Sequence, residues 1–282
     1  MTLKRVGIHW NSTKPTGYEV ALRLIDQLKR RGVEVCANDE LAGKLNMPKQ
    51  GFEGCGLLIV LGGDGTILSA LDAAIPCDIP ILGVNLGRLG FLTELEVKDL
   101  DDAVIDRVLA GDFAIDTRMT MRVEGWDEMT MFALNDIVFT RATPEVRIIA
   151  LEYEADGALV DRISGDGLIV ATATGSTAYS LSSGGPIVMP GLECFVLTPV
   201  SPHTLNARPV VVSSGHRITV RMLDDRGGAQ AVLDGRRAIQ FNRECREITI
   251  CRSARDAKFV RLAEHNIFGL LRSKLSEWTH WR

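Results

Sequence analysis

One aspartate stands where a carboxylate could take up a proton or touch a metal beside phosphate groups. Asp64 lies in the stretch Gly-Gly-Asp-Gly-Thr at 62–66, between an apolar run at 57–61 and good helix formers at 67–74. This pattern predicts a buried parallel strand, a turn and a helix. Ligands of open α/β sheets bind at the carboxyl ends of strands, where glycines and helix-start amides accommodate phosphate. The turn therefore predicts a phosphate site with Asp64 as proton acceptor or metal contact.

A plain glycine turn with a helix-capping Asp would show the same local pattern and stays open as an alternative. The two best-known phosphate loops are not present. Gly43-Lys44 lacks the earlier glycine and the following Ser or Thr of a P-loop. The Gly54-x-Gly56 pair precedes the strand and lacks the third glycine of the dinucleotide fingerprint.

A second stretch, at 164–186, is rich in glycine and in hydroxyl side chains. It also carries a carboxylate, Asp166, and an aromatic ring, Tyr179. Hydroxyls and amides suit phosphate and amide groups, a carboxylate suits a ribose or a carboxamide, and a ring can stack on a base. The residues after Gly175 predict a short helix whose start faces the ligand. A long surface loop is the alternative, but twenty residues without secondary structure are unusual in a compact domain, which favours binding.

A third candidate is the polar pair Asn135-Asp136 inside the apolar segment 134–137. Burying these groups without partners would cost about 1–3 kcal/mol each. We expect them to face a polar ligand, and an internal capping network is the alternative.

The order of elements predicts two domains and a tail. Residues 1–115 alternate strands (6–8, 33–36, 57–61, 79–85) with helices, which predicts a doubly wound, mostly parallel α/β sheet. Residues 116–262 predict a β-rich, mainly antiparallel domain, with turns at 155–157 and 233–235. Residues 263–282 predict a C-terminal helix that packs back on the first domain.

Composition narrows the class of protein. The chain has 282 residues, 46% of them hydrophobic, and a net charge of −4, which argues against a nucleic-acid partner. Its six cysteines form no C-x-x-C pair, so we expect no protein-bound metal. No apolar run reaches the length of a membrane span and the N-terminus has no apolar signal segment. We expect a cytoplasmic protein without a membrane partner.

Together these motifs resemble the NAD kinase family. The resemblance rests on the 62–66 turn, the glycine-punctuated stretch at 83–92, the Asn-acid pair, the run at 166–186 and Pro-His-Thr-Leu-x-x-Arg-Pro at 202–209. It extends from about residue 5 to residue 265. It implies an N-terminal α/β domain and a C-terminal β-rich domain with the substrate in the cleft between them. It also implies a homodimer or homotetramer whose sites can draw on a neighbouring subunit.

The resemblance implies transfer of the terminal phosphoryl group of ATP, or of inorganic polyphosphate, to the 2′-hydroxyl of the adenosine ribose of NAD. Mg²⁺ or another divalent cation would bridge the donor phosphates, with Asp64 as proton acceptor. The residues expected to contact the phosphates are Gly63, Gly65 and Thr66. Asn135 and Asp136 are assigned to the ribose hydroxyls, and Asp166 to the nicotinamide end. The residues placed around the dinucleotide are Thr174, Thr177, Ala178, Tyr179, Ser180, Leu181 and Ser182, with Arg147 and Arg236 as further contacts.

Three positions depart from the family pattern without removing a catalytic group. Asp136 replaces Glu, Ala173 replaces Pro and Arg236 replaces Gln. Two other functions remain as alternatives. A lipid kinase of the diacylglycerol or sphingosine type shares the 62–66 turn but should lack the 166–186 run. A non-catalytic NAD(P) sensor would keep that run but could lose Asp64.

Overall fold

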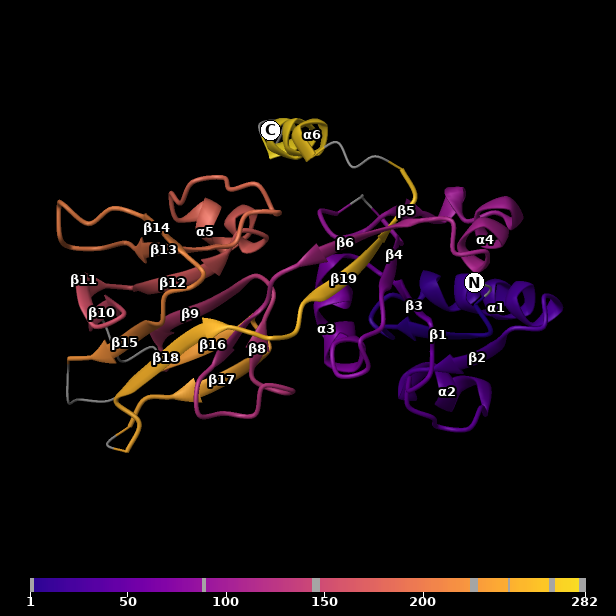
Figure 1. Cartoon of the computed structure of the whole chain (residues 1–282), viewed down its shortest axis with the longest axis horizontal. Coiled ribbons are helices and arrows are strands. Elements are labelled where there is room, and N and C mark those ends of the chain that lie inside the picture. The colour runs from indigo at the N-terminus through magenta and orange to yellow at the C-terminus, as the bar shows by residue number, and fades with distance from the viewer. Residues whose placement is uncertain are drawn as a thin grey trace. The chain divides into compact units, whose positions relative to one another are not determined.

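The computed structural model describes residues 3–87, 90–143, 148–223, 228–242, 244–263 and 267–278. The chain forms two compact units, Met1–Asp116 with Lys258–Arg282, and Thr117–Ala257 (Figure 1). The sequence analysis assigned residues up to 262 to the second domain, whereas the last strand pairs within the sheet of the first unit. Within the described part of the chain, no helix is both long enough and apolar enough to cross a membrane.

The first unit is built on one sheet in which parallel pairs dominate. Its strands are β1 (Arg5–Trp10), β2 (Glu34–Ala37), β3 (Leu57–Leu61), β4 (Ile81–Asn85), β5 (Leu95–Glu96), β6 (Ala114–Arg118) and β19 (Ala257–Arg261). Their order is β2-β1-β3-β4-β19-β6, with β5 also beside β4. β1 pairs parallel with β2 and β3, and β4 pairs parallel with β3, β5 and β19. The predicted mostly parallel sheet is confirmed.

Helices cover the sheet of the first unit. They are α1 (Thr16–Arg30), α2 (Asp39–Leu45), α3 (Asp64–Ala74), the 3-10 turn η1 (Val97–Asp99) and α4 (Asp102–Leu109), and a further helix, α6 (Ile267–Trp278), follows β19. Ile8 of β1 packs in a core with residues of α1 and α4. Since side chains alternate along a strand, the next residue, His9, faces the other way, where it meets Ser69 of α3. α6 spans the helix expected in the tail, and its packing remains a prediction.

The second unit contains two six-stranded antiparallel sheets. The first has the order β11 (Ala158–Gly165), β10 (Ile149–Ala155), β15 (Ile218–Met222), β18 (Glu247–Arg252), β7 (Met121–Val123), β8 (Phe132–Ala133). The second has the order β14 (Val210–Ser213), β13 (Cys194–Val200), β12 (Gly167–Thr172), β9 (Asp136–Arg141), β16 (Ala229–Leu233), β17 (Arg237–Gln240). Alternate residues of both sheets share one apolar core, which includes Leu151, Phe139 and Leu168. The predicted antiparallel domain is confirmed.

Two Asp-Gly turns set the register of two hairpins, and the segment after β12 packs on the outer face of the second sheet. Asp156-Gly157 and Asp234-Gly235 adopt positive φ between β10 and β11 and between β16 and β17, as the sequence predicts. After β12 the chain forms two short helical turns, η2 (Gly175–Thr177) and α5 (Tyr179–Ser182). Ala173 and Val188 pack against Ile169 of β12, so this segment covers the outer face of the second sheet.

Candidate functional site

Asp64 is the first residue of α3, directly after β3 and two glycines. Its carboxylate accepts hydrogen bonds from two backbone amides, Phe91 N–H on Oδ2 at 2.9 Å and Leu92 N–H on Oδ1 at 3.0 Å. Each carboxylate oxygen has two lone pairs, so each keeps one for a further hydrogen bond. The two amides fix the orientation of a half-buried carboxylate without using all of its accepting capacity.

A glycine allows the loop after β4 to approach Asp64. A Cβ added to Gly90 would lie 2.1 Å from Asp64 Oδ1, far inside van der Waals contact. The Gly90 N–H also donates to Thr93 Oγ1 at 2.8 Å, which fixes the loop from its other side. Glycine at position 90 therefore has a structural reason, which is to let this loop bring two amides onto the aspartate.

The phosphate residues expected from the sequence lie at the start of α3. Gly63 precedes the helix, Gly65 is exposed in its first turn, and Thr66 is buried. A Cβ on Gly62 would lie 2.3 Å from Thr66 Oγ1, so the Thr66 side chain lies over that glycine. The structure thus places Gly63, Gly65 and Asp64 in one helical start.

Sequence reasoning missed Asn85, the last residue of β4. Its side chain is buried, and its Oδ1 accepts from Gly87 N–H at 3.3 Å and would lie 3.9 Å from a Cβ on Gly63. Its Nδ2 has no hydrogen-bond partner among the residues that the structure describes. A polar residue closing an apolar strand, Ile-Leu-Gly-Val-Asn, is the signal that could have identified it.

In the second unit, Asp234 organises the polar pair Asn135-Asp136 at the start of β9. Its carboxylate accepts the backbone N–H groups of Leu134 at 2.8 Å, Asn135 at 2.8 Å and Asp136 at 3.0 Å. The sequence analysis treated Asp234 only as part of a turn. Burial raises the pKa of Asp234, while the three amides and Arg236 oppose that rise. The internal capping network considered as the alternative for the polar pair therefore exists. Its hydrogen bonds are made by the backbone N–H groups of the pair and not by its side chains.

The side chain of Asp136 is buried close to Asp234. Burial is the main cause that raises its pKa to about 7, and the charge of Asp234 adds to the rise. The N–H of Tyr179 donates to the Asp136 carboxyl and opposes it. This contact joins the start of β9 to the start of α5, so the second and third candidate stretches of the sequence meet in space.

The backbone of the 172–177 segment packs directly on Asn135. Thr172 N–H donates to the Asn135 carbonyl at 2.9 Å, and Thr172 Oγ1 donates to the Leu134 carbonyl at 2.6 Å. A Cβ on Gly175 would lie 1.9 Å from the Asn135 carbonyl oxygen, so only glycine fits here. The close approach sets the positions of Thr174 and Thr177 relative to the polar pair.

The stretch at 164–186 is more ordered than the sequence analysis assumed. Much of it belongs to β11 and β12 or to the short helical turns, so the argument from twenty structureless residues is wrong. Its fully buried members include Ser176, whose Oγ accepts from Val188 N–H at 3.0 Å, and Ser180, whose Oγ lies 2.8 Å from Thr198 Oγ1. Thr177, Ala178 and Leu181 are half-buried, whereas Tyr179 and Ser182 are exposed. Thr174 is buried, and its Oγ1 accepts from Arg118 at 3.5 Å.

Comparison with known proteins decides the family. The ATP-NAD kinase N-terminal domain model matches residues 6–113, and the ATP-NAD kinase C-terminal domain model matches residues 134–262. The chain belongs to the NAD kinase family. It is 39% identical to the NAD kinase of Heliobacterium modesticaldum over 96% of this chain and 98% of that one. It is 40% identical to the NAD kinase of Moorella thermoacetica, over 98% and 90%. Members are kinases, so this chain is a phosphotransferase.

Solved structures of NAD kinases share the fold. An NAD kinase from Archaeoglobus fulgidus in complex with ATP has a TM-score of 0.78 and 32% identity, covering 95% of this chain and 99% of that one. Yeast NADH kinase complexed with NADH has a TM-score of 0.85 and 25% identity, covering 100% and 90%. The lipid kinase and sensor alternatives are not favoured by these matches.

Of the remaining predicted residues, Asp166 lies away from the polar pair, whereas Arg236 lies beside Asp234. Asp166 precedes β12, about 20 Å along that six-residue strand from Thr172, with Arg141 3.9 Å from its carboxylate. Arg236 lies over the Phe132 ring, and its Nη2 is 3.9 Å from Asp234. Arg147 lies outside the described residues. In the described part of the chain, no group of three or more His, Cys, Asp or Glu side chains could hold a metal.

Proposed function

We propose that this chain makes NADP by transferring the terminal phosphoryl group of ATP to the 2′-hydroxyl of the adenosine ribose of NAD. The observation that carries the proposal is the oriented carboxylate of Asp64 among glycines at a helix start. Asp64 keeps a lone pair on each oxygen although two backbone amides hold it in place. It is therefore set to accept one further hydrogen bond, from the acceptor hydroxyl.

Orientation is the main contribution of Asp64 in this proposal. A ribose hydroxyl is a weak acid and a carboxylate is a weak base, so complete deprotonation before transfer is unfavourable. In a loose phosphoryl-transfer transition state little covalent chemistry is required of the protein, and positioning contributes most. The two amides at Phe91 and Leu92 remove the rotational freedom that would otherwise weaken this positioning.

The donor phosphates would lie against the start of α3, where Gly63, Gly65 and Thr66 offer amides and a hydroxyl. A divalent cation such as Mg²⁺ would neutralise charge on the transferred phosphoryl group. Magnesium is commonly held by substrate phosphates with one or two carboxylates, which fits a chain with no cluster of ligating side chains in its described part. Asp64 is the carboxylate that the fold offers at this turn.

The second unit would bind the dinucleotide. Asn135 and Asp136 would meet the ribose hydroxyls, and Thr174, Thr177, Ala178, Tyr179, Leu181 and Ser182 would surround the rest. Ser180 would act by positioning, since its hydroxyl is buried against Thr198. Arg236 would act near Asp234, over Phe132.

Asp166 would contact the nicotinamide end from another copy of the chain. Within one chain the strand β12 separates it from Thr172 by about 20 Å. This separation supports the homodimer or homotetramer expected from the resemblance. That assembly, the cytoplasmic location, the contact of Arg147 and the use of inorganic polyphosphate or NADH remain predictions.

The test is NADP formation by purified protein from NAD, ATP and Mg²⁺, comparing wild type with Asp64→Asn. We expect kcat to fall by about 10²–10⁴-fold, the range for loss of a general base. NAD binding measured by calorimetry should stay within about twofold, because the substitution leaves the groups of the second unit intact. An Asp64→Asn enzyme that keeps most of its rate would refute the assignment.

A matched control separates chemistry from loop disturbance. In Asp64→Asn the new amide cannot accept a hydrogen bond through its nitrogen, so the 90–92 loop loses one bond as well as the charge. Thr93→Val loosens the same loop by removing the acceptor of Gly90 N–H, but keeps the carboxylate. We expect the control to lose less than about tenfold in kcat, consistent with one net hydrogen bond.

A further inference from the structure

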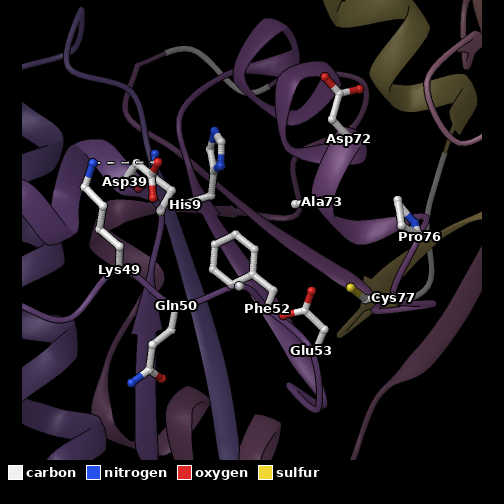
Figure 2. A pocket seen from close by; sticks show the side chains of 12 residues that line it. His9, Asp39, Lys49, Gln50, Phe52, Glu53, Asp72, Ala73, Pro76 and Cys77 are labelled. Atoms are coloured by element: carbon white, nitrogen blue, oxygen red, sulfur yellow. Dashed lines mark ion pairs between the residues drawn. The ribbon is translucent and has the colours of Figure 1, made fainter.

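A cavity of about 490 Å³ lies in the first unit, and its lining includes none of the described residues proposed to bind substrate (Figure 2). Its walls come from β1, from the segments on either side of α2 and from the later part of α3. The volume is within the range of small-molecule sites. His9, near the end of β1, and Asn38, directly after β2, bring one wall of the cavity to the carboxyl ends of parallel strands, where open α/β sheets bind ligands; the opposite wall includes Pro76 and Cys77, which follow α3.

The helix that begins at Asp64 also forms a wall of this cavity. Asp72 and Ala73 line it, and they follow Asp64 by eight and nine residues, which is about 12 Å along the helix axis. Hydrogen bonds link the cavity-lining His9 to the first turn of this helix. His9 Nε2 lies 3.3 Å from Ser69 Oγ, and that hydroxyl donates to the Thr66 carbonyl at 2.7 Å. A nucleoside triphosphate, with its base at one end and its γ-phosphate at the other, matches this arrangement.

The lining has the chemistry of a site for an uncharged ring with amino groups. Phe52, Ala73 and Pro76 offer apolar surface. Three carboxylates line the cavity against one ammonium, and that ammonium, Lys49, lies 3.9 Å from Asp39. Burial lowers the pKa of His9, so its ring adds no positive charge at neutral pH. Negative walls disfavour phosphate, but they accept hydrogen bonds from N–H donors.

We propose that this cavity binds the purine base of the phosphoryl donor, with its exocyclic amino group toward the carboxylate of Glu53. The triphosphate then extends along α3 to the turn at 62–66. This inference rests on the proposed kinase function and specifies its donor. Inorganic polyphosphate has no base, so the cavity contributes nothing to its binding.

The test places a larger side chain on α3 so that it fills the cavity. Ala73→Phe places a ring into the space, and Ala110→Phe, at the exposed end of α4 outside the cavity, is the control. We expect Ala73→Phe to raise KM for ATP by about tenfold or more, as for loss of one base contact. KM for NAD, and the inhibition constant of inorganic tripolyphosphate against ATP, should stay within about twofold of wild type. Ala73→Leu, a smaller change, should give the same pattern at lower amplitude.

The outcomes separate this inference from the function on which it rests. A folded Ala73→Phe protein with an unchanged KM for ATP overturns it. The inference is also overturned if the inhibition constant of tripolyphosphate rises as much as the KM for ATP, because the ring would then obstruct phosphates rather than a base. If wild type forms no NADP from ATP, the proposed function fails, and calorimetric titration with ATP at saturating NAD still tests the cavity. Weaker ATP binding in Ala73→Phe then supports the inference, and equal binding refutes it.

Discussion

The carboxyl of Asp136 should make the protein less stable as the pH rises, and Asp136→Asn should remove that dependence. Its ordinary pKa of 3.8 rises to about 7 in the folded protein, chiefly through burial and secondarily through Asp234. Between these two values the native state binds more protons than the unfolded chain, so the free energy of unfolding falls with rising pH. Stability from this group is therefore complete below pH 3.8 and is lost as the pH rises through 7.

The size of this change in the free energy of unfolding follows from the rise in the pKa of Asp136. One pKa unit corresponds to 1.36 kcal/mol, and the interval from pH 5 to pH 8 contains about two units in which only the native state holds the proton. Wild type should therefore lose about 2–3 kcal/mol relative to Asp136→Asn over that interval. The variant keeps a side-chain oxygen that can accept from Tyr179 N–H, so this hydrogen bond should contribute similarly at both pH values.

Urea unfolding followed by circular dichroism at pH 5 and pH 8 measures the difference. Asp102→Asn is the control, because hydrogen bonding to Arg31 lowers the pKa of Asp102 and keeps it ionised across the interval. Its difference from wild type should not change with pH. A difference between Asp136→Asn and wild type that is also the same at both pH values would refute the reasoning.

Two further variants test contacts in the first unit. Gly90→Ala should lower kcat by about tenfold or more, because the added methyl would displace the Asp64 carboxylate, while NAD affinity measured by calorimetry stays unchanged. Glu94→Gln should lower the free energy of unfolding by about 3 kcal/mol in urea, because it breaks a buried ion pair with Arg261, 3.1 Å away. A stability loss below about 1 kcal/mol, typical of exposed pairs, would show that this ion pair is not desolvated.

The first four strands of the first unit were predictable because their signals are local. The apolar run at 57–61 and the glycines after it define β3 and the start of α3 without reference to the rest of the chain. The strand β12 was missed because its apolar core, Leu168–Ala171, is flanked by glycines and hydroxyls that also suit a loop. Those glycines serve packing, since a Cβ on Gly167 would lie 2.1 Å from the Phe139 carbonyl oxygen.

The parts of the site that depend on distant residues could not be predicted. Asp234 receives amides from residues about a hundred positions earlier, and a turn motif gives no indication of such a partner. The two amides on Asp64 come from a loop whose glycine spacing was recognised, but spacing alone does not show which group the amides meet. Periodicity and turn chemistry predict the local secondary structure of a residue. The hydrogen-bond donors of these two carboxylates, however, come from residues that are distant in the sequence.

The pairing of β19 with β4 constrains the order in which the chain can fold during synthesis. Phe259 lies beside Ile81 in the finished sheet, although the whole second unit separates them along the chain. A nascent chain that has emerged only as far as residue 250 would have β1, β2, β3 and β4 ready, but one edge of the buried strand β4 would lack its β19 neighbour. Such an edge invites pairing with other chains. Long-range closure is also slow, so folding of the first unit should end only after the second has been made.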